Sequence, residues 1–211
     1  MITMADLRPG DIGFGPLCGG WGELAMWGEV IVDGGFRVGD LNVGHAYEVT
    51  EVQAGGLGLP GGPTPSDPVV HVVEAMPNGA REVTIGQERW TDQYAYVRMP
   101  EDYPGQAADA AAFARAMIGT PYSPASYLAL AAWRFGMKTP KLEAWIGRTR
   151  EGVMPPGLPC EAICSVLVDQ SWALTGKQVM PKGTPHQCVT PSGLGAALLA
   201  MPGAAWFWPG H

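Results

Sequence analysis

The chain has 211 residues, of which 46% are hydrophobic, and its formal net charge is -7. This length predicts one substantial core, so we expect residues 1–211 to form a single domain. The acidic excess argues against nucleic acid and anionic membrane surfaces as main partners, since both require concentrated Lys and Arg. No uncharged apolar run approaches the roughly 18 residues of a membrane span, and MITMADLRPGD lacks the basic start and apolar run of a signal peptide. We therefore expect no integral membrane segment and synthesis in the cytoplasm.

The first half of the chain has the pattern of an antiparallel sheet meander. In LRPGDIGFG, a Pro-Gly-Asp turn leads into a short buried strand from Asp11 to Phe14. Alternating side chains predict a strand over residues 43–53, and VVHVVEAM predicts another over 69–76. The Gly- and Pro-rich residues 54–68 are too poor in packing side chains for a regular element, so we expect a mobile loop. Two further strands are predicted at REVTI, after a turn at Pro77, Asn78 and Gly79, and at YAYVRM from Tyr94.

Helices are expected to flank this sheet, which gives an α+β fold. The Ala-rich residues 106–119 end in Gly, as helices often do. The aromatic end AAWFWPGH is expected to pack back on the body, with a protein-partner interface as the alternative. Further helices are predicted from Trp21, from Ser123 as an N-cap, at the stretch around Cys164, and from Pro191.

Cys164 lies within the first turn of a predicted helix that follows Pro159 and buries the apolar side chains of VLVDQSW, and this position suits a nucleophile. Unpaired N–H groups and a partial positive charge at a helix start favour thiolate over thiol. The backbone N–H groups of Cys164 and Ser165 also offer a site for an oxyanion. Two requirements of acyl transfer therefore meet at one location. The alternative interpretation is that Cys164 is a small apolar core residue.

A thiol nucleophile needs a base, and His45 and His71 both lie in predicted strands. His45 follows Gly44 at a strand start, where it can face a helix terminus. His71 and Glu74 differ in parity, so they should point to opposite faces of the sheet. Glu74 lies in an apolar strand and would be costly to bury unless paired. If the two strands are neighbours, Glu74 could orient the His45 imidazole, as the third member of a triad does. The alternative interpretation of a strand histidine is a structural residue, and the alternative for Glu74 is an exposed carboxylate at a strand end. The other two histidines of the chain are His186 and His211.

Six segments of the chain occur in an order that resembles a known family. They are LRPGDIGF, GHAYEV, HVVEAM, GTPYSPASYLAL, ICSVLVDQSWALTG and VTPSGLGAAL. This order resembles the permuted NlpC-like branch of the papain-fold cysteine hydrolases, which includes YiiX-like proteins and is related to lecithin:retinol acyltransferase. The resemblance spans residues 7–200. In this branch the histidine strand precedes the cysteine helix, as His45 precedes Cys164 here.

The resemblance implies a circularly permuted papain-like fold and a set of roles. It makes Cys164 the nucleophile, His45 the base and Glu74 the third polar residue of the site. It also implies that Asp11 is structural and closes its turn.

The chain departs from the family pattern at three places. The connection between His45 and Glu74 is long, Gly44 replaces a commoner Ser, and residues 137–157 are inserted. The long connection leaves Glu48 as a substitute for Glu74. Glu48 is three residues from His45, however, and should face away from it.

The four cysteines also permit other interpretations. A zinc site from Cys160, Cys164, His186 and Cys188 matches the usual tight spacing of structural sites poorly. Cys160 and Cys164 do not form a Cys-x-x-Cys redox motif, so Cys160 is interpreted as a neighbour at the rim of the site. Cys18 and Cys188 are expected to be structural free thiols, because a mid-sized chain without a secretion signal is an improbable disulfide framework. We expect no metal and no organic cofactor.

These residues predict a thiol hydrolase or acyltransferase acting on a peptide or lipid-like acyl substrate. The resemblance implies peptidoglycan peptides or lipid amides and esters, with a peptidoglycan peptidase as the leading hypothesis. A wall substrate would require delivery by a phage particle, a lysis system or a secretion machine. The alternative from another class is a non-catalytic virion or assembly module that docks a partner through its aromatic tail.

Overall fold

A computed structural model describes residues 3–16, 37–38, 41–54, 68–102, 104–122, 162–176, 178–181 and 189–209. Most of the predicted loop 54–68 and all of residues 137–157 lie outside these ranges. The same holds for the helices predicted from Trp21 and Ser123. Other residues outside the described ranges are Cys18, Cys160, His186, Cys188 and His211.

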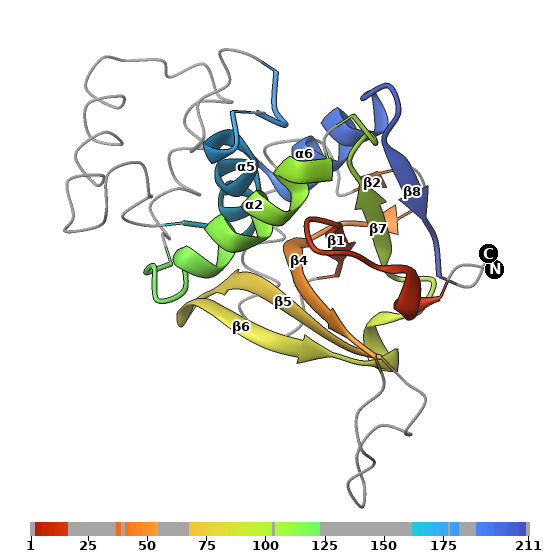
Figure 1. Cartoon of the computed structure of the whole chain (residues 1–211), viewed down its shortest axis with the longest axis horizontal. Coiled ribbons are helices and arrows are strands. Elements are labelled where there is room, and N and C mark those ends of the chain that lie inside the picture. Colours follow the sequence, from red (N-terminus) through yellow and green to blue (C-terminus); the bar gives the residue numbers. More distant parts are fainter. Residues whose placement is uncertain are drawn as a thin grey trace, which may run out of the picture.

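A six-stranded antiparallel sheet forms the centre of the described structure (Figure 1). Its strand order is β6-β5-β4-β1-β7-β8, which confirms the antiparallel sheet predicted from sequence. A two-stranded sheet pairs β2 with β3. The strands are β1 (Ile12–Gly15), β2 (Arg37–Val38), β3 (Leu41–Asn42), β4 (His45–Gln53), β5 (Val69–Met76), β6 (Gly79–Ile85), β7 (Ala95–Arg98) and β8 (Ala205–Phe207).

Three α-helices of the described chain, α2 (Pro104–Ala116), α5 (Cys164–Leu174) and α6 (Pro191–Leu199), complete the α+β fold. Figure 1 shows α2 and α5 together over one face of the sheet, and both contact β4. The start of α6 follows its sequence: Thr190 accepts the N–H of Gly193 at 2.8 Å, and Pro191 occupies the first turn. None of the described helices is long and apolar enough to cross a membrane.

Each face of the sheet buries its own apolar cluster. The helix-side cluster includes Phe14, Val73, Leu167 and Trp172, all fully buried. Strand alternation sends other residues to the opposite face, where the second cluster is smaller. Two short 3₁₀ helices, η1 (Met4–Asp6) and η2 (Gln87–Arg89), lie in the segments that border this second cluster. The second cluster comprises Met4, Leu7, Tyr47, Val49, Val70, Val72, Ile85 and Tyr96.

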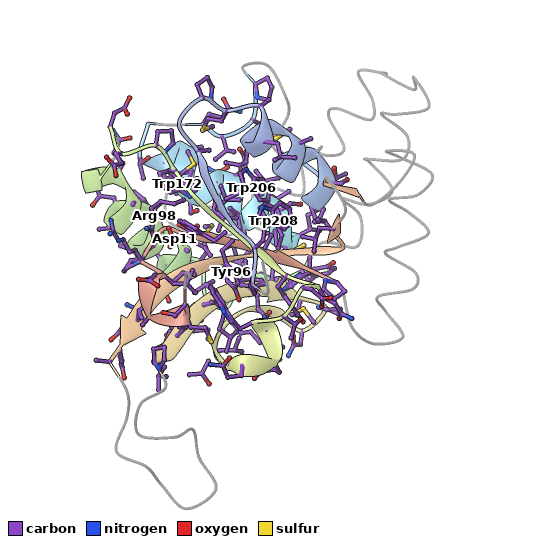
Figure 2. All side chains as sticks on the ribbon, turned by 90° about the vertical axis from the view of Figure 1, so that its right-hand side faces the viewer. Asp11, Tyr96, Arg98, Trp172, Trp206 and Trp208 are labelled. Carbon is purple, nitrogen blue, oxygen red and sulfur yellow. The ribbon has the colours of Figure 1, made fainter. Side chains whose placement is uncertain are left out.

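The aromatic C-terminal segment packs back on the body, as predicted, over the residues the structure describes. Strand β8 pairs with β7, and Trp206 stacks on Phe14 with ring centroids 5.8 Å apart. Trp206 also stacks on Trp208 at 5.4 Å. Figure 2 shows both tryptophans on the same side of the sheet as Trp172, and all three belong to or border the helix-side cluster.

Asp11 closes the turn before β1, as the resemblance implied. Its Oδ2 accepts the backbone N–H of Arg8 at 2.8 Å, and the Asp11 N–H donates to the carbonyl of Arg8. Arg98 of β7 donates to both carboxylate oxygens, at 2.9 and 2.7 Å, and the two side chains are labelled in Figure 2. The Arg98 guanidinium also lies 4.8 Å from the ring centroid of Phe207. Asp11 thus ties the β1 turn to β7 and, through Arg98, to β8.

Gly13 gives the ring of Tyr47 its place on the sheet. A Cβ at Gly13 would lie 2.1 Å from Tyr47 Cε2, and Tyr47 is fully buried. Gly13→Ala should therefore lower the free energy of unfolding by about 2 kcal/mol or more, since overpacking displaces buried side chains. Denaturant unfolding measures this loss.

Gly86→Ala is the matched control for Gly13→Ala. Its Cβ would meet only the flexible end of the Glu88 side chain, so it should change the stability little. In a Tyr47→Leu background, which lacks the ring atoms nearest to Gly13, the same Gly13→Ala change should have a smaller effect. Equal losses in both backgrounds would show that the Tyr47 ring is not the obstacle.

Candidate active site

Cys164 is the first residue of α5 and is held at a fixed place against the sheet. Ile163 precedes it as the N-cap with extended backbone. One residue earlier, the Ala162 N–H donates to the carbonyl of Pro121 at 3.0 Å. Within the first turn, the Ser165 hydroxyl donates to the carbonyl of Val189 at 2.6 Å. These contacts fix the start of the helix, and the Cys164 thiol is free and buried there with 2% exposure.

His45 is the first residue of β4, paired with Gly15 of β1. Strands β4 and β5 are antiparallel neighbours, and Glu48 pairs with Val73. Glu48 and Val73 therefore share one face of the sheet. Because side chains alternate along a strand, His45 and Glu74 lie together on the other face. His45 Nε2 lies 3.0 Å from Glu74 Oε2, and both side chains are buried. The structure therefore brings together the histidine and the carboxylate that the sequence singled out.

The second ring nitrogen of His45 is the one left for Cys164. Glu74 occupies Nε2, and Nδ1 is buried without a hydrogen-bond partner among the described residues. His45 and Cys164 interact electrostatically and alter each other's pKa. A proton can accordingly pass between Nδ1 and the thiol while Glu74 holds the opposite edge of the ring.

Cys164 and His45 favour the ionised form of each other. Burial lowers the pKa of His45, but Cys164 and Glu74 outweigh it and raise that pKa to about 9. Burial raises the pKa of the Cys164 thiol, yet the imidazolium of His45 and the N–H groups of Ala46 and Ser165 bring it below its ordinary value. Each group therefore shifts the pKa of the other in the direction of a thiolate and imidazolium pair.

Two backbone N–H groups interact with the Cys164 sulfur. One belongs to Ser165, whose N–H was proposed from the sequence, with that of Cys164, as a donor to an oxyanion. The Ala46 N–H, from the strand rather than the helix, was not foreseen. No side-chain pattern marks a backbone group, so only the placement of β4 beside the start of α5 reveals it.

Glu74 is fully buried and remains a carboxylate because cations surround it. Burial raises its pKa, but His45, Arg89 and Arg81 together hold that pKa far below its usual range. Arg81 donates to Oε1 at 3.1 and 2.8 Å, and Arg89 donates to Oε2 at 3.0 Å. Sequence reasoning missed both arginines. Arg81 had a usable signal, because the hairpin around Pro77 pairs it directly with Glu74.

Glu48, the substitute considered for Glu74, lies on the helix side of the sheet and faces away from His45. It is fully buried, and its Oε2 contacts the hydroxyl of Ser171 on α5. Burial raises the pKa of Glu48 to about 8 even though Ser171 lowers it. The Ser171 hydroxyl also reaches the carbonyl of Val168 at 2.7 Å. One hydroxyl proton cannot serve two acceptors, and a protonated Glu48 resolves this by donating in return.

His71 stands apart from the site, on the face opposite Glu74, as its parity predicted. It is half-buried and lies near Glu51 and Glu82. The described residues contain no group of three or more His, Cys, Asp or Glu side chains arranged to hold a metal ion. Three of the four ligands in the zinc alternative lie outside the described residues, so that alternative remains a hypothesis.

Comparisons with protein-family models, with curated proteins and with solved structures found no match for the chain. Evidence for a function therefore comes from the geometry of Cys164, His45 and Glu74.

The neutral Glu48 gives the protein a characteristic dependence of stability on pH. Its folded-state pKa of about 8 exceeds the ordinary value of 4.5, so it gains a charge on unfolding at any pH between the two. Stability falls as pH rises through this window. Glu48→Gln should raise the free energy of unfolding at neutral pH by roughly 1–3 kcal/mol and flatten its decline from pH 5 to 8.

Denaturant unfolding across this pH range measures the effect, with Glu101→Gln as the control. Glu101 is exposed, so its substitution should leave the pH dependence as it is. A decline that is equally steep with and without the Glu48 carboxyl would contradict a neutral Glu48.

Proposed function

We propose that this protein is a cysteine hydrolase that cleaves amide or ester bonds through an acyl-enzyme. The observation that carries the proposal is the arrangement of Cys164, His45 and Glu74. A buried thiol at a helix start interacts with an imidazole whose other nitrogen contacts a buried carboxylate. This is the arrangement of nucleophile, base and orienting group that acyl transfer needs.

The first half of the proposed reaction forms the acyl-enzyme. The Cys164 thiolate attacks the substrate carbonyl carbon, a C–S bond forms, and the carbonyl electrons move to oxygen. Backbone N–H groups at the start of α5, including that of Ser165, stabilise the oxyanion. The His45 imidazolium then gives its Nδ1 proton to the leaving nitrogen or oxygen as the C–N or C–O bond breaks.

The second half releases the product. Neutral His45 takes a proton from water, the hydroxide attacks the thioester, and the C–S bond breaks to restore the thiolate and the imidazolium. An acceptor hydroxyl or amine in place of water would make the reaction an acyl transfer. Glu74 keeps the ring in one orientation through both halves and stabilises its protonated form.

The chain order of these groups is consistent with a circularly permuted papain-like fold, which we include in the proposal. The strand that bears His45 comes before the helix that bears Cys164, and an antiparallel sheet carries the base against the start of that helix. The sequence resemblance implies the same order of the two elements.

Peptidoglycan peptides are the substrate class that we propose to test first, following the sequence resemblance. Wild-type protein should release new amino groups from purified peptidoglycan, and Cys164→Ala should abolish the release. Glu74→Gln should lower kcat/KM by roughly 10²–10³, because the imidazole loses its orienting charge. Glu48→Gln, on the other face of the sheet, serves as a matched carboxyl-to-amide control with unchanged turnover.

The outcomes of this assay separate the substrate from the mechanism. Cleavage of lipid amides or esters in place of peptidoglycan would change the substrate class and keep the mechanism. Cleavage that survives Cys164→Ala would contradict the mechanism itself.

The ionised pair can also be tested without a substrate. In a Cys18→Ser, Cys160→Ser, Cys188→Ser background, iodoacetamide should alkylate Cys164 at about pH 6 at least tenfold faster than in the same background with His45→Ala. The thiol pKa is lowered and the His45 pKa is raised to about 9. Turnover should therefore rise through the lowered thiol pKa and fall as pH passes about 9.

Mass spectrometry follows the alkylation over the pH range. Identical profiles for wild-type protein and His45→Ala would show that the imidazole does not activate the thiol, and the proposed mechanism would then be wrong.

A further inference from the structure

We infer that Arg89 is a positioning residue, which holds Glu74 Oε2 in place and so sets the direction of the His45 imidazole. The inference deepens the proposed function and rests on it. Arg89 contacts Glu74 and acts on His45 only through that carboxylate, so it is not assigned a contact with Cys164 or with a reacting atom.

The two oxygens of Glu74 have different partners. Oε1 accepts both hydrogen bonds from Arg81, whereas Oε2 accepts from Arg89 at 3.0 Å and lies 3.0 Å from His45 Nε2. Arg89 and His45 therefore meet at one oxygen atom. Any change in the Arg89 contact moves or reorients the acceptor on which the imidazole depends.

Contacts with Tyr47 and Tyr96 hold both the side chain and the backbone of Arg89. Its guanidinium lies 5.2 Å from the ring centroid of Tyr47. The Tyr47 hydroxyl donates to the Tyr96 hydroxyl at 3.1 Å, which in turn donates to the backbone carbonyl of Arg89 at 2.8 Å. Trp90 packs on Tyr96 with ring centroids 5.0 Å apart. Both ends of Arg89 are thus anchored to aromatic residues of the sheet, and the direction of its guanidinium is determined.

Arg81 lacks these restraints and makes a suitable comparison. It pairs with Glu74 through the β5–β6 register and contacts only the oxygen that His45 does not use. Its side chain is 43% exposed, against 22% for Arg89. The two arginines carry equal charge on the same carboxylate, but only Arg89 has the geometry to orient the imidazole.

The charge of Arg89 also reduces the extent to which Glu74 raises the pKa of His45. The charged groups of the cluster are Glu74, Arg81, Arg89, His45 and the Cys164 thiolate. The remaining titratable groups around Arg89 are the phenols of Tyr47, Tyr94 and Tyr96. Without the Arg89 charge, the carboxylate beside His45 is less neutralised, so His45 should keep its proton to a higher pH and donate it less readily.

The test is a titration of His45 by NMR, with its signal assigned by comparison with His45→Ala. Arg89→Met should raise the pKa of His45 by at least about 0.5 relative to wild-type protein. Arg81→Met should give less than half of that shift. Arg89→Lys, which keeps the charge but not the planar fork, should recover at least half of it.

A second variant keeps the test decisive if Arg89→Met does not fold. Tyr96→Phe removes only the hydroxyl that contacts the Arg89 carbonyl and leaves every charge in place. Loss of this contact should loosen the Arg89 guanidinium from Glu74 Oε2, so the carboxylate is less neutralised and the His45 pKa should rise by a smaller amount than in Arg89→Met. An unchanged pKa in both Arg89→Met and Tyr96→Phe, or equal shifts in Arg89→Met and Arg81→Met, would overturn the positioning role.

Failure of the proposed function has a different signature. In that case wild-type His45 titrates near its ordinary value of 6.5, and Cys164 alkylation does not depend on His45. If wild-type protein shows the raised pKa and the His45-dependent alkylation while the arginine variants change nothing, the proposed function stands and only the role of Arg89 is lost.

Discussion

The ionised carboxylate of Glu74, fully enclosed between a sheet and a short 3₁₀ helix, is the group around which the site is organised. An isolated buried charge costs several kcal/mol, so it persists only with partners that compensate for lost water. Here the partners come from three different elements: His45 from β4, Arg81 from β6 and Arg89 from η2. Because one carboxylate needs all of them, the positions of these elements are coupled through it.

The sheet itself supplies the space for this arrangement. Gly13 leaves room for the Tyr47 ring beside β1, and the Arg89 guanidinium lies over that ring, 5.2 Å from its centroid. Cys164 reaches the same point from the opposite face because α5 begins where β4 begins, with the Ala46 N–H directed to the sulfur. The groups of the candidate site are therefore held by packing on both faces of the sheet, which is the rigidity that a preorganised site requires.

The sequence predicted strands β1, β4, β5, β6 and β7 because alternation and turn residues are local signals, whereas the short strands β2, β3 and β8 were not predicted. Residues 69–76 were placed to the residue, whereas the helix predicted at 106–119 spans Pro104–Ala116, since its last predicted residues form a turn that ends at Gly119. Glu74 and its neighbour His45 could be paired from sequence because an acid in an apolar strand demands a partner. Arg89 could not, since its contact depends on where a loop returns to the sheet after Ile85. No periodic pattern in the sequence predicts the path of that loop.

Glu48 and Glu74 lie on opposite faces of one sheet, and these two faces hold the same kind of side chain in different charge states, one neutral and one ionised. Both are fully buried, but Glu74 faces cations and stays ionised, whereas Glu48 faces a serine and an apolar helix side. A second carboxylate in this sheet would add to the negative field at His45 and strengthen its hold on the proton. A neutral Glu48 adds none. In the proposed mechanism we therefore assign the acid strength of His45 to Glu74 and the arginines on its own face, and we expect a change at Glu48 to alter stability and a change at Arg89 to alter the pKa of His45.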